Sequence, residues 1–361
     1  MQKIQGDILY AASDIVNFLE CAHLTRLDLI NLDTPLPKDE ESEEVQLLQD
    51  RGYAHEAAFS DMLATRHQSI CDIASQASEI EQMREATLSA MDAGIEIICQ
   101  ATLKKDSLLG HIDFLRRVPV PSRFGDYSYE VIDTKLARKI KTKFIIQTAC
   151  YSSLLSSVQE VTPERMHIVF GNRAEESLHY ADYAYYFTTI LARFSDFVQG
   201  RQQDTYPSPC SHCDYCCWRT LCKLRWIEDD HLSQVAGITK LQIKKLQAAG
   251  ITTLAELGTC TTDLKVAKMS TATLEKLSGQ ASLQLQAREN GRRPVELLPQ
   301  QPGKKGFARL PQPAAGDLFF DMEGDPLTDG GLEYLFGIYF FSAGKPLFNL
   351  SSRKDITRKY N

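Results

Sequence analysis

A buried β-strand that ends in two charged residues is encoded by Tyr129-Glu-Val-Ile-Asp-Thr-Lys135. Valine and isoleucine favour strands, and successive side chains of a strand point to opposite faces of a sheet. Asp133 and Lys135 therefore project from one face, away from Ile132. A carboxylate can bind a divalent metal, and a lysine beside it can orient a water molecule, so the pair is a candidate catalytic site.

The surrounding sequence predicts an α/β domain. Residues 95–103 and 108–115 are expected to be strands, and a hairpin connection would bring Asp113 alongside Asp133, where two carboxylates can form a hard oxygen site for magnesium or manganese. Helical spacing predicts helices over residues 13–30, 41–64, 144–158 and 183–198, the first of them capped by Ser13. Residues 166–170 are expected to form one further buried strand. Together with the cysteine-rich loop that follows, these elements define a first domain of residues 1–228.

The composition is that of a globular protein. The chain has 361 residues, a net charge of −7 and 43% hydrophobic residues, which allows two or three domains and excludes wholesale disorder and collagen-like repeats. No stretch approaches the roughly 18 apolar residues of a membrane span, and no secretory signal is present, so we expect a cytoplasmic protein without a membrane partner. The negative net charge argues against a protein that binds nucleic acid over most of its surface, but it allows a local basic groove.

Four short motifs follow one another in a fixed order: Gly52-x-x-His55-Glu56, Gly110-x-x-Asp113, Asp133-x-Lys135 and Gln147-x-x-x-Tyr151. In this order they resemble the motifs of the PD-(D/E)XK nuclease superfamily, specifically its RecB-like branch, which includes the AddB-type and CRISPR-associated exonucleases. The likeness covers roughly residues 10–225. It implies a restriction-endonuclease-like core, with a mixed sheet flanked by helices.

The resemblance implies a catalytic site of six residues: His55, Asp113, Asp133, Lys135, Gln147 and Tyr151. The first three would bind Mg²⁺ or Mn²⁺, the lysine would position the attacking water, and the last two would contact the nucleic-acid strand. Phosphodiester hydrolysis needs a polarised phosphoryl oxygen, an activated water and help for the leaving oxygen, which a bound metal and a lysine can supply.

Four basic residues follow the strand: Arg138, Lys139, Lys141 and Lys143. They are candidates for contacts with the phosphate backbone, which would be independent of sequence and sensitive to salt. A solvated helix start explains them equally well.

Five cysteines crowd one loop: Cys210, Cys213, Cys216, Cys217 and Cys222. In a reducing compartment such spacing indicates a metal centre rather than disulfides, and the local cysteines at 210, 213, 216 and 222 could form a zinc site. RecB-like nucleases with an iron–sulfur cluster show Cys-x2-Cys-x5-Cys and one distant cysteine. The resemblance thus implies a 4Fe-4S cluster held by Cys21, Cys213, Cys216 and Cys222, with Cys210 as an alternative ligand and zinc as the alternative metal.

The remaining sequence predicts a small all-α region over residues 229–290, a linker over 291–316 and an incomplete domain over 317–361. The turns Val235-Ala-Gly-Ile238 and Ala248-Ala-Gly-Ile251 resemble helix-hairpin-helix elements, which grip phosphate, although a plain helical linker is an equal alternative. The strand with Asp321-Met-Glu323 resembles the first motif of RNase H-like exonucleases, and we expect residues 351–361 to be a tail outside that fold.

The whole layout resembles bacterial multidomain RecB-like nucleases, which can continue into a helicase; it implies a helicase partner or a lost C-terminal helicase region. We predict a metal-dependent deoxyribonuclease that acts on single-stranded or duplex DNA ends, with the iron–sulfur cluster as a structural staple. A non-catalytic nucleic-acid-binding module with structural zinc is the alternative. RNA also stays open as a substrate, because nothing in the motifs reads a 2′-hydroxyl group.

Overall fold

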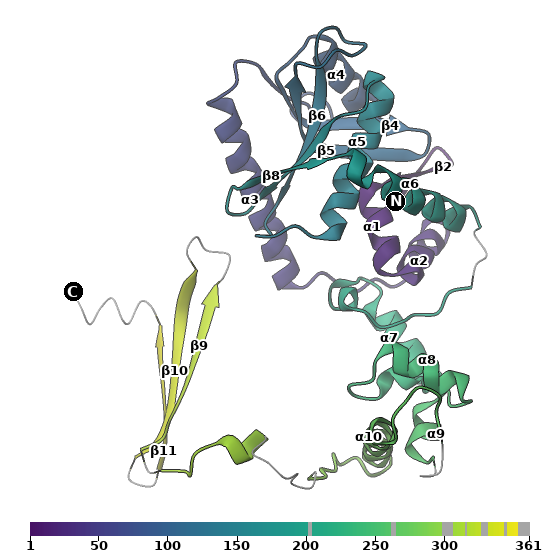
Figure 1. The fold of residues 1–361 in the computed structure, drawn as a ribbon, viewed down its shortest axis with the longest axis vertical. Coiled ribbons are helices and arrows are strands. Elements are labelled where there is room, and N and C mark those ends of the chain that lie inside the picture. Colours follow the sequence, from purple (N-terminus) through teal and green to yellow (C-terminus); the bar gives the residue numbers. More distant parts are fainter. Residues whose placement is uncertain are drawn as a thin grey trace. The chain divides into compact units, whose positions relative to one another are not determined.

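The computed structural model describes residues 1–200, 204–260, 265–297, 306–314, 316–325, 331–342 and 345–352. The chain divides into two units, Met1–Val295 and Glu296–Asn361. The first unit contains a mixed sheet flanked by helices, which confirms the predicted α/β class (Figure 1). Among the described residues, no helix combines the length and the apolar character needed to cross a membrane.

The sheet of the first unit has eight strands: β1 Gln2–Ile4, β2 Asp7–Ala11, β3 Ile70–Asp72, β4 Ile97–Lys105, β5 Leu108–Val118, β6 Ser128–Lys135, β7 Arg165–Phe170 and β8 Glu175–His179. The main path runs β1-β2-β5-β6-β7-β8, and β4 pairs with both β3 and β5. The pairs β2–β5, β3–β4 and β6–β7 are parallel and the others are antiparallel.

Strand β5 changes its partner along its length. At its start Leu108 and Leu109 pair with β2, whereas the residues from Phe114 onward pair with β6. Asp113 lies between these two ladders. Strands β5 and β6 therefore separate beyond the Phe114–Ile132 pair, beside Asp113, and this fork lies where the candidate catalytic residues meet.

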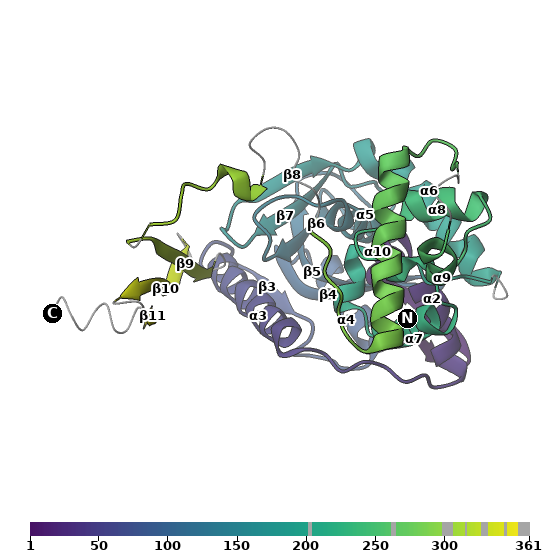
Figure 2. The same cartoon turned by 90° about the horizontal axis from the view of Figure 1, so that it is seen from below.

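Six helices belong to this α/β part: α1 Ala12–Glu20, α2 Ala22–Asp33, α3 Glu43–Ala64, α4 Ile80–Asp92, α5 Thr142–Gln159 and α6 Ala181–Gln199. Figures 1 and 2 show α3 on one side of the sheet and α5 on the other. Phe59 of α3 packs on Phe114 and Ile132, whereas α5 packs on the opposite face, against residues such as Leu115 and Val131. These two cores fix both helices relative to the end of β6.

The prediction of one helix over residues 13–30 with a Ser13 cap is wrong. Cys21 is extended, with φ −158° and ψ 106°, and it separates α1 from α2. The first cap position is Ala11, whose N–H donates to Asp14 at 2.7 Å. No proline or glycine causes the break; Cys21 instead packs in a small core around Trp218. Tertiary contacts therefore override the local helical pattern here.

The rest of the first unit is helical. It contains two 3₁₀ helices and four α-helices: η1 Ser211–Tyr215, α7 Arg219–Glu228, η2 Leu232–Gln234, α8 Lys240–Ala248, α9 Leu254–Gly258 and α10 Thr271–Asn290. Residues of η2 and of α8 to α10 share a hydrophobic core of their own, which includes Leu246 and Leu277. The two predicted turns contain Gly237 at φ 75° and Gly250 at φ 83°, backbone conformations that favour glycine.

The second unit contains η3 Gly306–Arg309 and an antiparallel sheet ordered β11-β10-β9. Its strands are β9 Leu318–Asp325, β10 Leu332–Ser342 and β11 Lys345–Ser352. The acidic side chains of Asp321 and Glu323 lie on β9, beside a hollow of about 260 Å³. Residues 351 and 352 belong to β11, so the predicted tail is wrong for these two residues; residues 353–361 lie outside the described part.

A partly buried ionic network connects β5, β6, β7 and β8. His167 Nε2 lies 2.9 Å from Glu130 Oε2, and His167 Nδ1 lies 2.9 Å from Glu175 Oε1, which also contacts Arg116 at 3.0 Å. Burial alone would lower the pKa of His167, but the bonds to Glu130 and Glu175 outweigh burial and raise it. The bond from His167 is the main cause that lowers the pKa of Glu175 to about 2.

We expect His167→Gln to lower the free energy of unfolding by about 2 kcal/mol near pH 6, because it leaves buried Glu130 without its charged partner. The folded-state pKa of His167 lies above the ordinary value of 6.5. Its contribution is therefore complete below that value and disappears as the pH rises through the folded-state pKa. Urea unfolding across pH 5.5 to 9 measures the difference, with exposed His179→Gln as the control. A difference independent of pH contradicts the prediction.

Candidate active site and cysteine cluster

The side chains of Asp133 and Lys135 meet at the end of β6. Asp133 is completely buried, and Lys135 Nζ lies 2.7 Å from its Oδ2. This oxygen accepts no hydrogen bond of good geometry from the protein. The ion pair holds both groups at the fork of the sheet.

Asp113 joins this pair from β5. Its Oδ2 accepts hydrogen bonds from the backbone N–H of Thr134 at 2.7 Å and from the Thr134 hydroxyl group at 2.8 Å. The carboxylate of Asp113 thus replaces a strand partner for β6 at the point where the two strands separate. The structure places Asp113 beside the Asp133–Lys135 segment, where the sequence predicted it.

Helix α5 brings the amide of Gln147 to the same carboxylates. Its Nε2 lies 3.4 Å from Asp133 Oδ1 and 3.1 Å from the Tyr151 hydroxyl group. Tyr151 is only 6% exposed, which leaves little surface for a nucleic-acid strand. A side chain on Gly110 would come within 2.7 Å of Leu154, so glycine at this position permits the close approach of α5.

His55 lies on α3, and its Nε2 is 3.5 Å from the carbonyl oxygen of Val169 on β7. The side chain therefore faces the strand next to β6. The following residue, Glu56, accepts a hydrogen bond from the side-chain amide of Gln100 on β4. No role was predicted for Glu56 or for Gln100. The signal for Gln100 was its polarity within the apolar segment of residues 95–103.

Negative charge exceeds positive charge in this site. Burial, opposed by Lys135 and reinforced by Asp113 and Glu56, raises the pKa of Asp133 to about 7. Burial also opposes the charged form of Lys135, but the three surrounding carboxylates outweigh it and raise the pKa of the lysine. Three carboxylates share one ammonium group, an imbalance that a divalent cation would relieve.

The donor chemistry of these residues fits Mg²⁺ or Mn²⁺, because carboxylate oxygens are the ligands that hard cations prefer. In the described part of the chain, no three His, Cys, Asp or Glu side chains are arranged closely enough to hold a metal ion. Lys135 contacts Asp133, and Thr134 satisfies Asp113. Cation binding at this site would therefore require these donors to move away from the carboxylates.

The four basic residues follow β6 as exposed side chains: Arg138, Lys139, Lys141 and Lys143. Lys143 belongs to the first turn of α5. Burial lowers the pKa of His212 in the cysteine loop, Glu20 opposes this effect, and Lys143 lowers it further. The cysteine loop thus lies near the start of α5.

Five cysteines line one small cavity: Cys21, Cys210, Cys213, Cys216 and Cys222. The structure therefore brings Cys21, at the break between α1 and α2, to the cysteines of the distant loop. The Sγ atoms of Cys210 and Cys213 are 3.8 Å apart, and none of the ten cysteines forms a disulfide, all of them being in described segments. Trp218 ties the loop to α2, because its Nε1 donates to Asp28 at 2.9 Å.

The thiols are crowded together and half-buried. Burial, with repulsion from neighbouring thiolates, raises the pKa of Cys213 to about 11 and that of Cys222 to about 12. A bound metal centre would favour thiolates instead, so the ligand type suits a cluster. As with the carboxylates, the described thiols would have to move closer together to bind one. Cys217 does not line the cavity, whereas Cys210 does, so the choice among the five remaining thiols stays a prediction.

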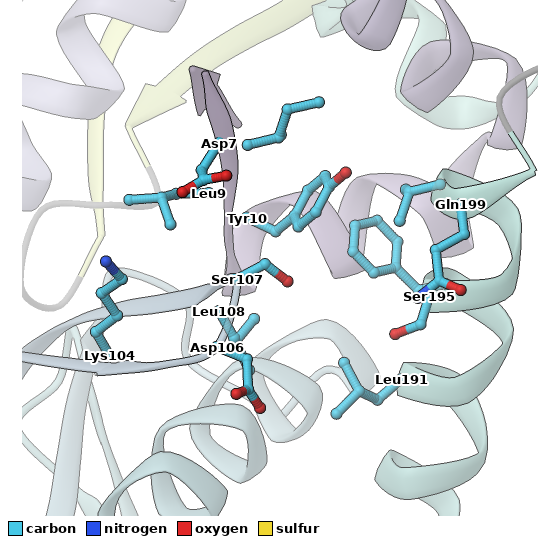
Figure 3. A pocket seen from close by; sticks show the side chains of 13 residues that line it. Asp7, Leu9, Tyr10, Lys104, Asp106, Ser107, Leu108, Leu191, Ser195 and Gln199 are labelled. Atoms are coloured by element: carbon cyan, nitrogen blue, oxygen red, sulfur yellow. The ribbon is translucent and has the colours of Figure 1, made fainter. Parts of the chain in front are cut away.

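A larger cavity of about 430 Å³ lies between β2, the β4–β5 turn and α6. It contains none of the predicted site residues. Figure 3 shows the Lys104 amine and the Asp106 carboxylate pointing in different directions, so its charged groups do not converge on one point. The chemistry therefore favours the fork between β5 and β6 as the candidate active site.

A scan of protein-family models finds none that matches this chain, and a search of curated proteins finds no significant match.

Proposed function

We propose that the first unit is a RecB-like nuclease domain of the PD-(D/E)XK type that hydrolyses phosphodiester bonds of DNA with Mg²⁺ or Mn²⁺. The proposal rests on the group formed by Asp113, Asp133 and Lys135 at the fork of the sheet. The raised pKa of buried Asp133 supports it, because strongly perturbed pKa values concentrate at functional sites. The excess of carboxylates also supports it, because carboxylate oxygens are preferred ligands of hard divalent cations.

The chain's own residues would act as follows. A divalent cation bound by Asp113 and Asp133, with His55 as the further predicted ligand, would supply electrophilic polarisation of the phosphate and favour ionisation of water. Lys135 would orient the attacking water and offset the negative charge that develops on the phosphate. Gln147 holds Asp133 from the α5 side, and the basic residues after β6 would contact the phosphate backbone.

We also propose that the cysteine cavity holds a 4Fe-4S cluster, with zinc as the alternative. The cluster would join the α1–α2 break to the cysteine loop and so fasten the two ends of the nuclease domain. Phosphate contacts by the two glycine turns, the RNase H-like character of residues 317–361 and a helicase partner stay predictions.

The test is cleavage of end-labelled single-stranded and duplex DNA by anaerobically purified full-length chain. We expect cleavage with Mg²⁺ or Mn²⁺ and none when EDTA removes the metal, because the carboxylates alone cannot polarise a phosphate. RNA of the same sequence serves as the comparison substrate. DNA binding without any cleavage favours the non-catalytic module, and cleavage of RNA alone overturns the assignment of substrate.

A further inference from the structure

Gln100 has a strained backbone inside a strand. Its φ is 53°, and among the described residues it is the one non-glycine residue with a left-handed φ inside a strand. The ladder with β5 continues on both sides of it, since Cys99 pairs with Phe114 and Ala101 pairs with Ile112. Such strain persists only where surrounding structure enforces it, and it concentrates at functional sites.

At Gln100 the side chains of β4 exchange sheet faces, and β5 does the same at the residue opposite. Ile97 and Cys99 of β4 belong to the core under α3, whereas Ala101 belongs to the core under α5. An undistorted strand would keep all three on one face. Strand β5 changes in the same way, since Phe114 faces α3 and Ile112 faces α5. Gln100 and Asp113 therefore lie side by side at the point where both strands turn.

Helix α3 places the Glu56 carboxylate beside Gln100. Gln100 Nε2 donates to Glu56 Oε1, and one turn later the Phe59 ring packs edge-on against Phe114 with 5.2 Å between ring centroids. Phe114 is the residue after Asp113, so the same contact that anchors α3 keeps Glu56 close to Asp113. Burial and the charge of Asp113 raise the pKa of Glu56, and Lys135 opposes them.

We propose that Glu56 is a further carboxylate ligand of the divalent cation site and that Gln100 is the residue that positions it. This inference rests on the proposed nuclease function. Lys135 forms its ion pair with Asp133, whereas the Glu56 carboxylate accepts a hydrogen bond from the Gln100 amide and interacts with Lys135 only electrostatically. A third carboxylate suits a site that must hold a doubly charged ion in a buried position.

The experiment measures Mn²⁺ binding to the full-length chain by calorimetry and by electron paramagnetic resonance, with cleavage in parallel. We expect Glu56→Gln to weaken Mn²⁺ binding about tenfold or more and to slow cleavage about 100-fold. Asp61→Asn is the matched control, because Asp61 is an exposed acid on the same helix. Circular dichroism and the melting temperature verify that each variant folds.

Gln100→Gly separates positioning from structure. Glycine adopts a left-handed φ without strain, so this variant should be at least as stable as the wild type. It removes the amide that holds Glu56, so Mn²⁺ affinity should nevertheless fall several-fold, by about the amount seen when a supporting residue of a metal ligand is lost. A purely structural role for Gln100 would leave Mn²⁺ affinity unchanged and overturn the positioning role.

The outcomes separate the ligand role of Glu56 from the nuclease function on which it rests. If the wild type binds Mn²⁺ and cuts DNA, and Glu56→Gln does both equally well, the ligand role of Glu56 is wrong and the nuclease assignment stands. If the wild type neither binds Mn²⁺ nor cuts DNA, the proposed function itself fails.

Discussion

Lys135→Ala is expected to reduce metal-dependent DNA cleavage by a factor on the order of 10³. The variant removes the one ammonium group that the carboxylates of Asp113, Asp133 and Glu56 share. In the proposed mechanism the attacking water would lose its orienting donor, and the charge that develops on the phosphate would lose the cationic side chain that offsets it. Single-turnover cleavage of end-labelled DNA at saturating Mg²⁺ measures the loss directly.

The fold should survive this substitution. Lys135 stabilises the charged form of buried Asp133, so its removal favours the protonated carboxyl group, which needs no cation. Lys105→Ala is the matched control, because Lys105 is an exposed lysine at the end of β4. Equal cleavage by the wild type and Lys135→Ala, with unchanged circular dichroism, would show that the catalytic assignment is wrong.

Cys21→Ser is expected to lower the melting temperature by about 10 °C or more, the second largest effect. A structural metal centre contributes roughly 10 kcal/mol to folding in small zinc domains, and losing one of its ligands forfeits several of these. For a domain of this size each kcal/mol corresponds to about 2–4 °C. Cys21 also lies at the α1–α2 break, so the cysteine loop would lose one attachment to these helices and keep the hydrogen bond from Trp218 to Asp28.

Metal content tests the proposed cluster in the same experiment. Iron, sulfide and zinc analysis of the wild type identifies the centre, and Cys71→Ser on β3 serves as the control outside the cavity. If Cys21→Ser keeps its full metal content and Cys210→Ser loses it, the ligands are the local cysteines 210, 213, 216 and 222, and Cys21 is not a ligand. A brown iron–sulfur absorbance that disappears in Cys21→Ser supports the long-range set.

The central strands could be predicted from sequence because their chemistry is local. Alternation in β6 places Asp133 and Lys135 on one face, and the β5 ladder then brings Asp113 alongside. The break at Cys21 could not be predicted, because the residues around it fit a helix and only packing against Trp218 separates α1 from α2. The outer strands β1 and β8 are largely exposed, so they lack the apolar pattern that marks β6.

The Glu56 and Gln100 pair shows a second limit. Because β4 contributes side chains to the cores on both faces of the sheet, its sequence is one continuous hydrophobic run without the alternation of a strand that has one exposed face. Glu56 lies in a helix of ordinary acidic composition. Only the pairing of β4 with β5 and the packing of Phe59 bring the two residues to the site.

The position of Cys21 has a consequence for synthesis on the ribosome. Its partners around the cavity emerge roughly 200 residues later, about 10–40 s at ordinary translation rates. For the proposed cluster to form, the thiol of Cys21 has to stay reduced and unbound during that interval. The sheet, whose strands precede the cysteine loop in sequence, can already assemble. The proposed cluster could therefore form only late in synthesis, and oxidising conditions during translation would leave a chain with a formed sheet and an unoccupied cysteine cavity.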